Sequence, residues 1–508
     1  MNRKSRFFSC LCLFLALSLS LISFTSCKDE NEEEKNTVNN GSEIEVADAN
    51  YVSDLPDDLN YDGAVIRMVS RDSAGTTDEF YCEEPDLSDV VDSAVMKRNS
   101  RVEEMLDVVI ECTLVPDGQD SHATISKRMD RENLAGTVSF DLVTGPMYTL
   151  IASALNGTFI NLSSLEYLDL SKYYWSQGYN YYASAGSVQH TATGAATLSI
   201  YRYMYVTVCN EQVFAAKGLP SLYEVVKAGD WTLEYQTNLT KDLYVNLNSD
   251  PERDKGDAYG FVSGARTSLD TYWISCDAQV ISKDDENFYT YIGSTDKLSS
   301  LVDRIFDLYY ENEGAYIVSS GIDDTNNAEI LSVFSAGNSA MASMMIMGIE
   351  NGLQNVEWEF SIVPIPKYDK AQKDYHTHVQ DQVTAFGICT ALSADMKQTV
   401  GAVMEAMGAE SYKYVYPAYF ENVLPYRYLK TPESAELLQT IYEGCDFSLV
   451  FQCLATEYPW TTLLRTVVDS EYNSISNQMA SLVDKIPISI EKVNNSYRDL
   501  IAKENQAS

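Results

Sequence analysis

Short apolar runs alternate with amphipathic segments early in the body of the chain. The runs at 63–70, 108–115 and 139–144 are rich in apolar residues, which is typical of strands buried on both faces. Between them, 90–107 and 122–134 carry apolar residues at helical spacing. Strands that alternate with helices at these distances predict right-handed βαβ units and a parallel sheet.

The ends of these strands are the first candidates for a ligand site. In open α/β sheets, ligands bind beyond the carboxyl ends of the strands. The sequence therefore predicts that a ligand approaches residues 70–72, 116–118 and 145–147.

The pattern changes near residue 163, where a polar, tyrosine-rich stretch begins. Alternation over 196–210 predicts a strand with Tyr201, Tyr203 and Tyr205 on one face. Segment 222–244 predicts two helices separated at Gly229–Asp230, with Thr232 as the cap of the second helix.

The second half of the chain returns to the order of strand then helix. We expect helices at 267–275, 295–311 and 395–410, and strands at 330–334, 359–366 and 383–390. From residue 411 onward we expect a helical chain with aromatic-rich turns at 412–420 and 456–460.

The N-terminus has the three parts of an export signal. Basic residues precede an apolar run at 7–24, and Cys27 follows small residues before an acidic stretch. This pattern resembles a bacterial lipoprotein signal, in which the cysteine is lipidated, although Phe24 stands where leucine is usual. The alternative is an uncleaved membrane anchor, for which the apolar run is at the short limit. Either interpretation places the body outside the cytoplasm, with 27–50 as a disordered acidic tether.

Charge and cysteine content exclude several classes of function. The chain has 508 residues and a formal net charge of −38, which repels nucleic acid and anionic lipid surfaces. This charge also argues against an acidic ligand unless a local basic pocket exists. The cysteines that follow Cys27 are scattered and odd in number, and they form no CxxC pair, so a disulfide framework or a zinc site is not expected.

Motifs of catalytic or metal chemistry are weak. The sequence contains no GxGxxG, Walker, HExxH or GxSxG motif. His376 and His378 form either a metal-binding pair or two exposed loop histidines. Asp250, Asp254 and Asp257 form either a calcium loop or a solvated turn, although their spacing does not fit an EF-hand. A carboxylate pair for glycoside hydrolysis stays possible among 74 acidic residues.

Aromatic residues are more informative, because the chain has 35 tyrosines and five tryptophans. Sugar rings stack on aromatic planes, and carboxylates, amides and arginine bind their hydroxyl groups. Trp231 is expected in the core, whereas Trp175 and Trp460 have features of both core and ligand-lining residues.

Several collinear segments together resemble the bacterial extracellular solute-binding proteins of sugar-uptake ABC transporters, in particular their long lipoprotein members. The segments that carry the resemblance are 55–72, 90–111, 140–145, 168–175, 222–234, 256–261, 334–341, 363–379 and 392–421. One departure is Tyr174, which stands where the family often has tryptophan.

The resemblance implies an α/β, two-lobed periplasmic-binding-protein-like fold of type II, with a central sheet and flanking helices in each lobe and a hinge between the lobes. It assigns 51–167 and 368–410 to the first lobe, and 168–367 and 411–503 to the second. The implied function is capture of a carbohydrate by lobe closure and its delivery to an ABC permease. The protein would be a lipid-anchored, extracellular monomer without enzymatic activity, cofactor or metal.

Candidate ligand contacts follow from position in this implied fold. The first lobe would contribute Arg71, Asp72, Gly145, Met147 and Asp381, and the hinge and second lobe would contribute Trp175, Trp273, Asn338, Tyr419 and Trp460. Two other functions stay open, a surface glycoside hydrolase and a structural or adhesive lipoprotein. The identity of the ligand is not determined by the sequence.

Overall fold

A computed structural model of the chain describes residues 51–80, 89–116, 122–293, 296–319, 328–429 and 431–507. The chain divides into Met1–Ser42 and Glu43–Ser508, and everything below concerns the second unit. The predicted signal, Cys27 and the tether lie outside the described residues.

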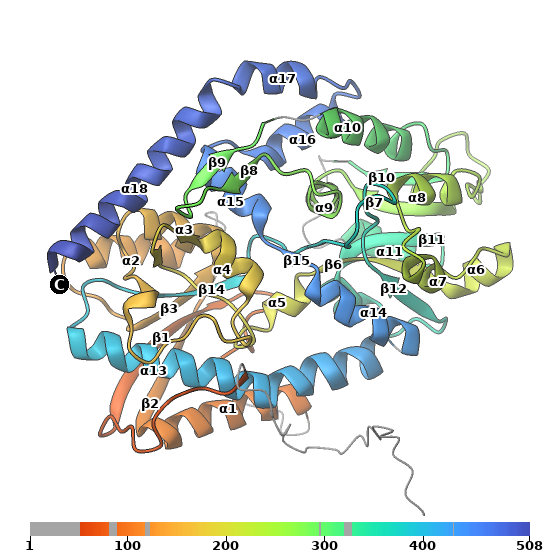
Figure 1. Ribbon diagram of the computed structural model, residues 1–508. Coiled ribbons are helices and arrows are strands. Elements are labelled where there is room, and N and C mark those ends of the chain that lie inside the picture. The colour runs from red at the N-terminus through yellow and green to blue at the C-terminus, as the bar shows by residue number, and fades with distance from the viewer. Residues whose placement is uncertain are drawn as a thin grey trace, which may run out of the picture. The chain divides into compact units, whose positions relative to one another are not determined.

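The first sheet has the strand order β14-β3-β1-β2 (Figure 1). Its strands are β1 (Ala64–Asp72), β2 (Val108–Pro116), β3 (Leu142–Pro146) and β14 (Thr384–Ile388). Strand β1 pairs in parallel with β2 and β3, while β14 pairs antiparallel with β3. The connecting and flanking helices are α1 (Val90–Leu106), α2 (Thr124–Leu134), α3 (Met147–Leu155) and α13 (Ala394–Glu410). The predicted βαβ units and the later return of the chain to this sheet are confirmed.

Local sequence accounts for the sharp ends of α1. The Asp89 side chain accepts hydrogen bonds from the N–H groups of Val91 and Asp92, which satisfies two of the donors that a helix start leaves free. At the other end, Asp107 adopts a left-handed conformation with φ 49°, which stops the helix and turns the chain into β2.

The second sheet has the order β10-β7-β11-β6-β12, in which β6 is antiparallel to both neighbours and the other pairs are parallel. Its strands are β6 (Tyr205–Asn210), β7 (Tyr259–Gly264), β10 (Ala315–Val318), β11 (Ser339–Met345) and β12 (Phe360–Val363). The helices between residues 177 and 352 are α4 (Gln177–Ala183), α5 (Ser199–Arg202), α6 (Glu211–Lys217), α7 (Leu222–Lys227), α8 (Leu233–Thr240), α9 (Thr267–Ser275), α10 (Asp296–Tyr309), α11 (Ala328–Ser335) and α12 (Ile346–Gly352).

The C-terminal part is helical and contacts both sheet regions. It comprises α14 (Pro432–Glu443), α15 (Ser448–Thr456), α16 (Trp460–Asp469), α17 (Ile475–Leu482) and α18 (Lys485–Ala507). Helix α18 packs on α15 and also reaches α3 (Figure 1). Three short pairings complete the structure: β4 (Ser184–Ala185) with β5 (Val188–Gln189), β8 (Ile281–Lys283) with β9 (Tyr289–Tyr291), and β13 (Thr377–His378) with β15 (Cys445–Asp446).

Two predicted helices and one predicted core residue are confirmed around residue 230. Helices α7 and α8 flank Gly229, and the Thr232 hydroxyl caps α8 by accepting from the Tyr235 N–H at 3.2 Å. Trp231 is fully buried, and its Nε1 donates to the Pro364 backbone oxygen at 2.8 Å.

Three predictions of secondary structure are wrong. Segment 196–210 is helix α5 followed by β6, and 330–334 lies in helix α11. In α11 the buried residues Ile330, Val333 and Phe334 have helical spacing, and a short apolar run does not by itself separate strand from helix.

The third error concerns 412–420, which is π-helix in continuation of α13 rather than a turn. Tyr412, Tyr416 and Phe420 stack there with 5.1 Å between successive ring centroids, so the aromatic residues are the packed face of a helix.

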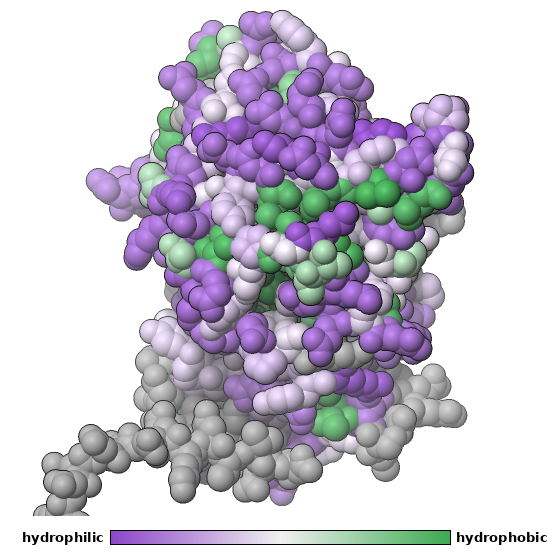
Figure 2. Space-filling model, turned by 90° about the vertical axis from the view of Figure 1, so that its right-hand side faces the viewer, coloured by the Kyte–Doolittle hydropathy of each residue, from purple (hydrophilic) through white to green (hydrophobic). Residues whose placement is uncertain are grey.

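One face of the molecule illustrates the polarity of the surface. The face on the right of Figure 1 is largely hydrophilic, with a band of apolar residues across its middle (Figure 2). Among the described helices, none combines the length and the apolar character needed to cross a bilayer. The predicted lobe boundaries stay a prediction.

Candidate ligand-binding site

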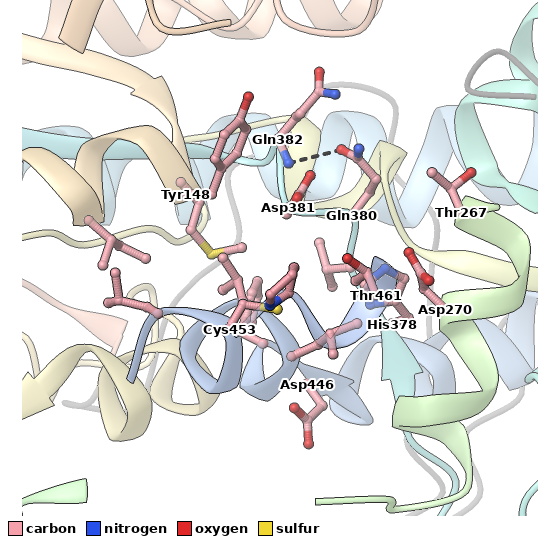
Figure 3. A pocket seen from close by; sticks show the side chains of 18 of the residues that line it. Tyr148, Thr267, Asp270, His378, Gln380, Asp381, Gln382, Asp446, Cys453 and Thr461 are labelled. Atoms are coloured by element: carbon pink, nitrogen blue, oxygen red, sulfur yellow. Dashed lines mark hydrogen bonds between the residues drawn. The ribbon is translucent and has the colours of Figure 1, made fainter. Parts of the chain in front are cut away.

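A cavity of about 480 Å³ lies where helices from both sheet regions meet the C-terminal helices (Figure 3). This volume is in the range of small-molecule sites. Its lining residues are Met147, Tyr148, Ile151, Arg266, Thr267, Asp270, His378, Val379, Gln380, Asp381, Gln382, Asp446, Phe447, Leu449, Val450, Cys453, Leu454, Pro459, Thr461 and Arg465.

Two strand-to-helix junctions position opposite walls of the cavity. Strand β3 of the first sheet ends directly before Met147, the first residue of α3. Strand β7 of the second sheet ends shortly before Thr267, the first residue of α9. Each junction lies at the carboxyl end of a strand, which is where open α/β sheets bind ligands.

The wall from the first sheet is held by backbone hydrogen bonds. The Met147 N–H donates to the Val383 oxygen at 2.8 Å, and the Tyr148 N–H donates to the Asp381 oxygen at 3.4 Å. The buried Arg71 reaches this segment from the end of β1, and its Nη2 donates to the Gln382 backbone oxygen at 2.5 Å. Arg71 therefore supports the wall from behind.

The opposite wall contains a buried ion pair between α9 and α16. Nε of Arg465 donates to Oδ1 of Asp270 at 3.1 Å, and Nη2 donates to Oδ2. Both carboxylate oxygens are thus engaged by one planar guanidinium group, a geometry that fixes orientation as well as charge. The pair holds α16 against α9.

His378 lies in the cavity wall and is buried, whereas the sequence pattern suggested an exposed loop residue. Strand β13 carries it opposite Asp446 of β15, and its ring stacks on Tyr205 with a centroid distance of 5.6 Å. Burial, together with the nearby Arg465 charge, lowers the pKa of His378 to about 3. The imidazole is therefore neutral, and no described residue forms a hydrogen bond with its Nδ1.

Two further carboxyl groups line the cavity. Burial raises the pKa of Asp381, while the charges of Arg465, His122 and Arg71 act in the opposite direction. Burial also raises the pKa of Asp446. The Asp446 carboxylate accepts from the Ser448 N–H at 2.6 Å and points away from the other labelled polar side chains in Figure 3.

Metal chemistry finds no support within the described ranges. No group of three or more histidine, cysteine, aspartate or glutamate side chains there could hold a metal ion. In the acidic loop at residues 250–257, the Asp257 carboxylate accepts from the Tyr244 hydroxyl at 2.9 Å and from the Leu247 N–H at 3.0 Å. The acidic loop is therefore closed by internal hydrogen bonds.

The structure places four predicted ligand contacts in or next to the cavity. Met147 and Asp381 line it. Trp460 is buried between the lining residues Pro459 and Thr461. Trp273 is buried three residues after the lining residue Asp270, and the centroids of the two rings lie 5.7 Å apart. Trp460 Nε1 donates to the Thr456 hydroxyl at 2.9 Å, so this indole is held in place.

The remaining predicted contacts are not among the lining side chains. Gly145 pairs with β14, and Asp72 is exposed and accepts from the Thr77 hydroxyl. Trp175 is buried beside Phe386, with a 6.0 Å centroid distance, in the core of the first sheet. Asn338 lies just before β11, and Tyr419 donates to Glu350 outside the cavity.

Sequence reasoning missed the charged residues of the second wall, Arg266, Asp270 and Arg465. The rule about carboxyl ends of strands was applied only to the first sheet, because 256–261 was not recognised as part of a strand of a second sheet. Applied to β7, the same rule places Arg266 at the start of α9.

No family model matches the sequence, and no curated protein does. Solved structures do match. The cyclic alpha-maltosyl-1,6-maltose binding protein from Arthrobacter globiformis is 10% identical with a TM-score of 0.53, covering 85% of this chain and 99% of that one. The GacH receptor of Streptomyces glaucescens, determined unliganded and with acarbose, is 11% identical with a TM-score of 0.51, covering 86% and 98%.

A third match is the maltose/maltodextrin-binding domain MalE from Bdellovibrio bacteriovorus, bound to maltotriose. It is 13% identical with a TM-score of 0.50, covering 84% of this chain and 99% of that one. At these identities the matches establish the fold. The chain has the two-lobed α/β fold of these binding proteins.

Proposed function

We propose that the protein is an extracellular solute-binding protein that captures a carbohydrate in this cavity and delivers it to an ABC permease. The observation that carries the proposal is the origin of the cavity walls, since α3 follows a strand of one sheet and α9 follows a strand of the other. The neighbouring folds belong to sugar-binding proteins and support the same function.

Capture would work through a shift between open and closed states. A ligand that touches both α3 and α9 gains contacts only when the two walls are close together. Such a ligand shifts the population toward the closed state by its difference in affinity for the two states.

The side chains of the cavity suit a sugar. Met147, Ile151 and Leu454 present apolar surface to the C–H faces of a ring. Asp381 would accept hydrogen bonds from hydroxyl groups, and Arg266 would donate them.

A thermal-shift screen of the purified protein against mono- and oligosaccharides tests the proposal. A ligand at 100 times its dissociation constant adds about 2.7 kcal/mol to the free energy of unfolding. Asp381→Asn should weaken binding roughly 10- to 100-fold, because it removes a charged hydrogen-bond acceptor. Asp72→Asn is the matched control, since Asp72 is exposed and does not line the cavity.

Absence of a shift with any sugar would contradict carbohydrate binding. Hydrolysis of a bound oligosaccharide by the purified protein would establish a glycoside hydrolase instead.

The membrane anchor is a separate part of the proposal, because Cys27 lies outside the described residues. We expect Cys27→Ala to be released into the medium and to bind ligand as the native protein does. Loss of binding in the released form would show that the anchor and the cavity are not independent.

A further inference from the structure

Arg266 differs from the other arginines at the cavity. Arg465 is paired with Asp270, and Arg71 donates to a backbone oxygen. The half-buried Arg266 side chain lines the cavity, and within the described part of the chain its guanidinium has neither an ion pair nor a hydrogen bond.

The groups around Arg266 are hydrogen-bond donors. Its own carbonyl is already used, since it accepts from the N–H groups of Leu269 and Asp270 at 3.0 and 3.2 Å. The N–H groups of Thr267 and Ser268 begin α9 and have no acceptor within the helix. The Thr267 hydroxyl has no hydrogen-bond partner among the described residues.

A second observation comes from another element of the same cavity. His378 is 6% exposed, and its Nδ1 lacks a hydrogen-bond partner within the described ranges. A buried polar atom without a partner is costly, so a ligand in this cavity that supplied a partner to Nδ1 would be favoured.

The carboxyl groups that line the cavity form no ion pair with Arg266 among the described residues. Asp270 is neutralised by Arg465 through both oxygens. Asp446 points away from the other labelled polar side chains (Figure 3), and Asp381 lies in the field of Arg465, Arg71 and His122. Arg266 therefore remains as the cation without a counter-charge.

We propose that the Arg266 end of the cavity binds a carboxylate of the ligand, so that the carbohydrate is an acidic one containing a uronic acid. A carboxylate has about four acceptor sites and no donor, which complements a cluster composed of donors. It also forms bidentate bonds with arginine. A hydroxyl group can also accept from arginine, but it carries no charge, and its own proton needs an acceptor. This inference rests on the proposed function and specifies its ligand.

Isothermal titration calorimetry with matched ligands tests the inference. The probes are uronic-acid oligosaccharides, such as trigalacturonate, and their carboxyl-reduced forms, in which CH₂OH replaces the carboxylate. We expect the native protein to bind an acidic oligosaccharide at least about 10-fold more tightly than its reduced form. Arg266→Gln should remove that preference, because it should weaken binding of the acidic sugar much more than binding of the reduced sugar. Arg131→Gln, at an exposed arginine of α2, should keep the preference.

Salt provides an independent readout. Because the chain carries a formal net charge of −38, it repels an anionic ligand at long range, so added salt should speed association of the acidic sugar. The reduced sugar should associate at a rate independent of salt.

The outcomes separate the two proposals. Equal affinity for acidic and reduced sugars, or an equal loss of both in Arg266→Gln, overturns the acidic ligand and leaves carbohydrate capture standing. Preference for sulfated sugars over uronates overturns the carboxylate assignment. Failure of every sugar to bind overturns the proposed function itself.

Discussion

Two buried glutamates show how this fold stabilises carboxyl groups in different ways. Glu405 of α13 and Glu350 of α12 each accept a hydrogen bond from a buried tyrosine, Tyr174 and Tyr419 respectively. The two sites differ in whether a cation lies beside the carboxyl group.

Glu405 has no cation beside it within the described residues. Besides Tyr174, the Trp175 Nε1 and the Asp169 N–H donate to it, at 3.4 and 3.1 Å. Burial raises the pKa of Glu405 to about 7, against the effect of these hydrogen bonds. This site lies among elements of the first sheet region, and its carboxyl group is roughly half protonated near pH 7.

Glu350 belongs to an ionic network around Arg202. The Arg202 guanidinium lies 3.4 Å from Glu350 and bonds both oxygens of Asp78, at 2.5 and 2.7 Å. Burial raises the pKa of Glu350 and the Arg202 charge opposes this rise. For Asp78, burial also opposes ionisation, but Arg202 holds the pKa below its usual value.

The comparison shows that burial alone does not set the protonation state of a carboxyl group. Asp78 follows β1 of the first sheet, whereas Glu350 follows β11 of the second, so the ionic network joins segments of both sheets. The Glu405 site fixes a loop onto a single helix.

The largest expected effect comes from removing the shared cation. Arg202→Met leaves the buried Glu350 and the partly buried Asp78 without a counter-charge, and it should lower the free energy of unfolding by about 3–5 kcal/mol. Urea denaturation at pH 7 measures this loss. Arg427→Met is the control, because Arg427 is exposed and its pair with Asp89 should contribute less than about 1 kcal/mol. Equal losses in the two variants would show that the Arg202 network contributes no more to stability than the exposed Arg427–Asp89 pair.

The pH dependence of stability should reveal the titration of the Glu405 carboxyl group. Its pKa is about 7 in the folded state and near its ordinary 4.5 when unfolded, so the folded protein holds this proton more tightly. The free energy of unfolding should therefore fall as pH rises from about 4.5 to 7, by roughly 3 kcal/mol from this group. Glu405→Gln should remove that part of the slope. Parallel pH profiles for the variant and the native protein would contradict the assignment.

The smallest expected effect separates the two tyrosine hydroxyls. Tyr174→Phe removes a donor from a carboxyl group without a cation and should cost about 1–2 kcal/mol. Tyr419→Phe leaves Glu350 beside Arg202 and should cost less than about 1 kcal/mol. Thermal or urea unfolding of both variants at pH 8 measures the two losses in the free energy of unfolding. A larger loss for Tyr419→Phe than for Tyr174→Phe would contradict the expected order.

Much of the first sheet could be predicted because apolar residues recur at different spacings in its strands and in its helices. The helix cap at Thr232 and the buried Trp231 were also predictable from local patterns. The structure of segment 412–420 was not predictable, because its aromatic residues make their contacts in a π-helix, and no sequence pattern indicates a π-helix there.

The candidate site was only partly predictable. Met147 follows directly from the end of a strand, but the Arg465–Asp270 pair joins residues 195 positions apart, and only the fold brings them together. Tryptophans were expected at the ligand because they stack on sugars, yet Trp175 supplies core packing and a donor to Glu405.

The Trp273–Trp460 pair gives the protein an internal optical probe. One indole follows the lining residue Asp270 in α9, and the other lies between the lining residues Pro459 and Thr461. A ligand that draws α9 and α16 toward α3 must alter the surroundings of both rings. Occupancy of the cavity should therefore be readable from intrinsic tryptophan fluorescence, without a label and at low protein concentration.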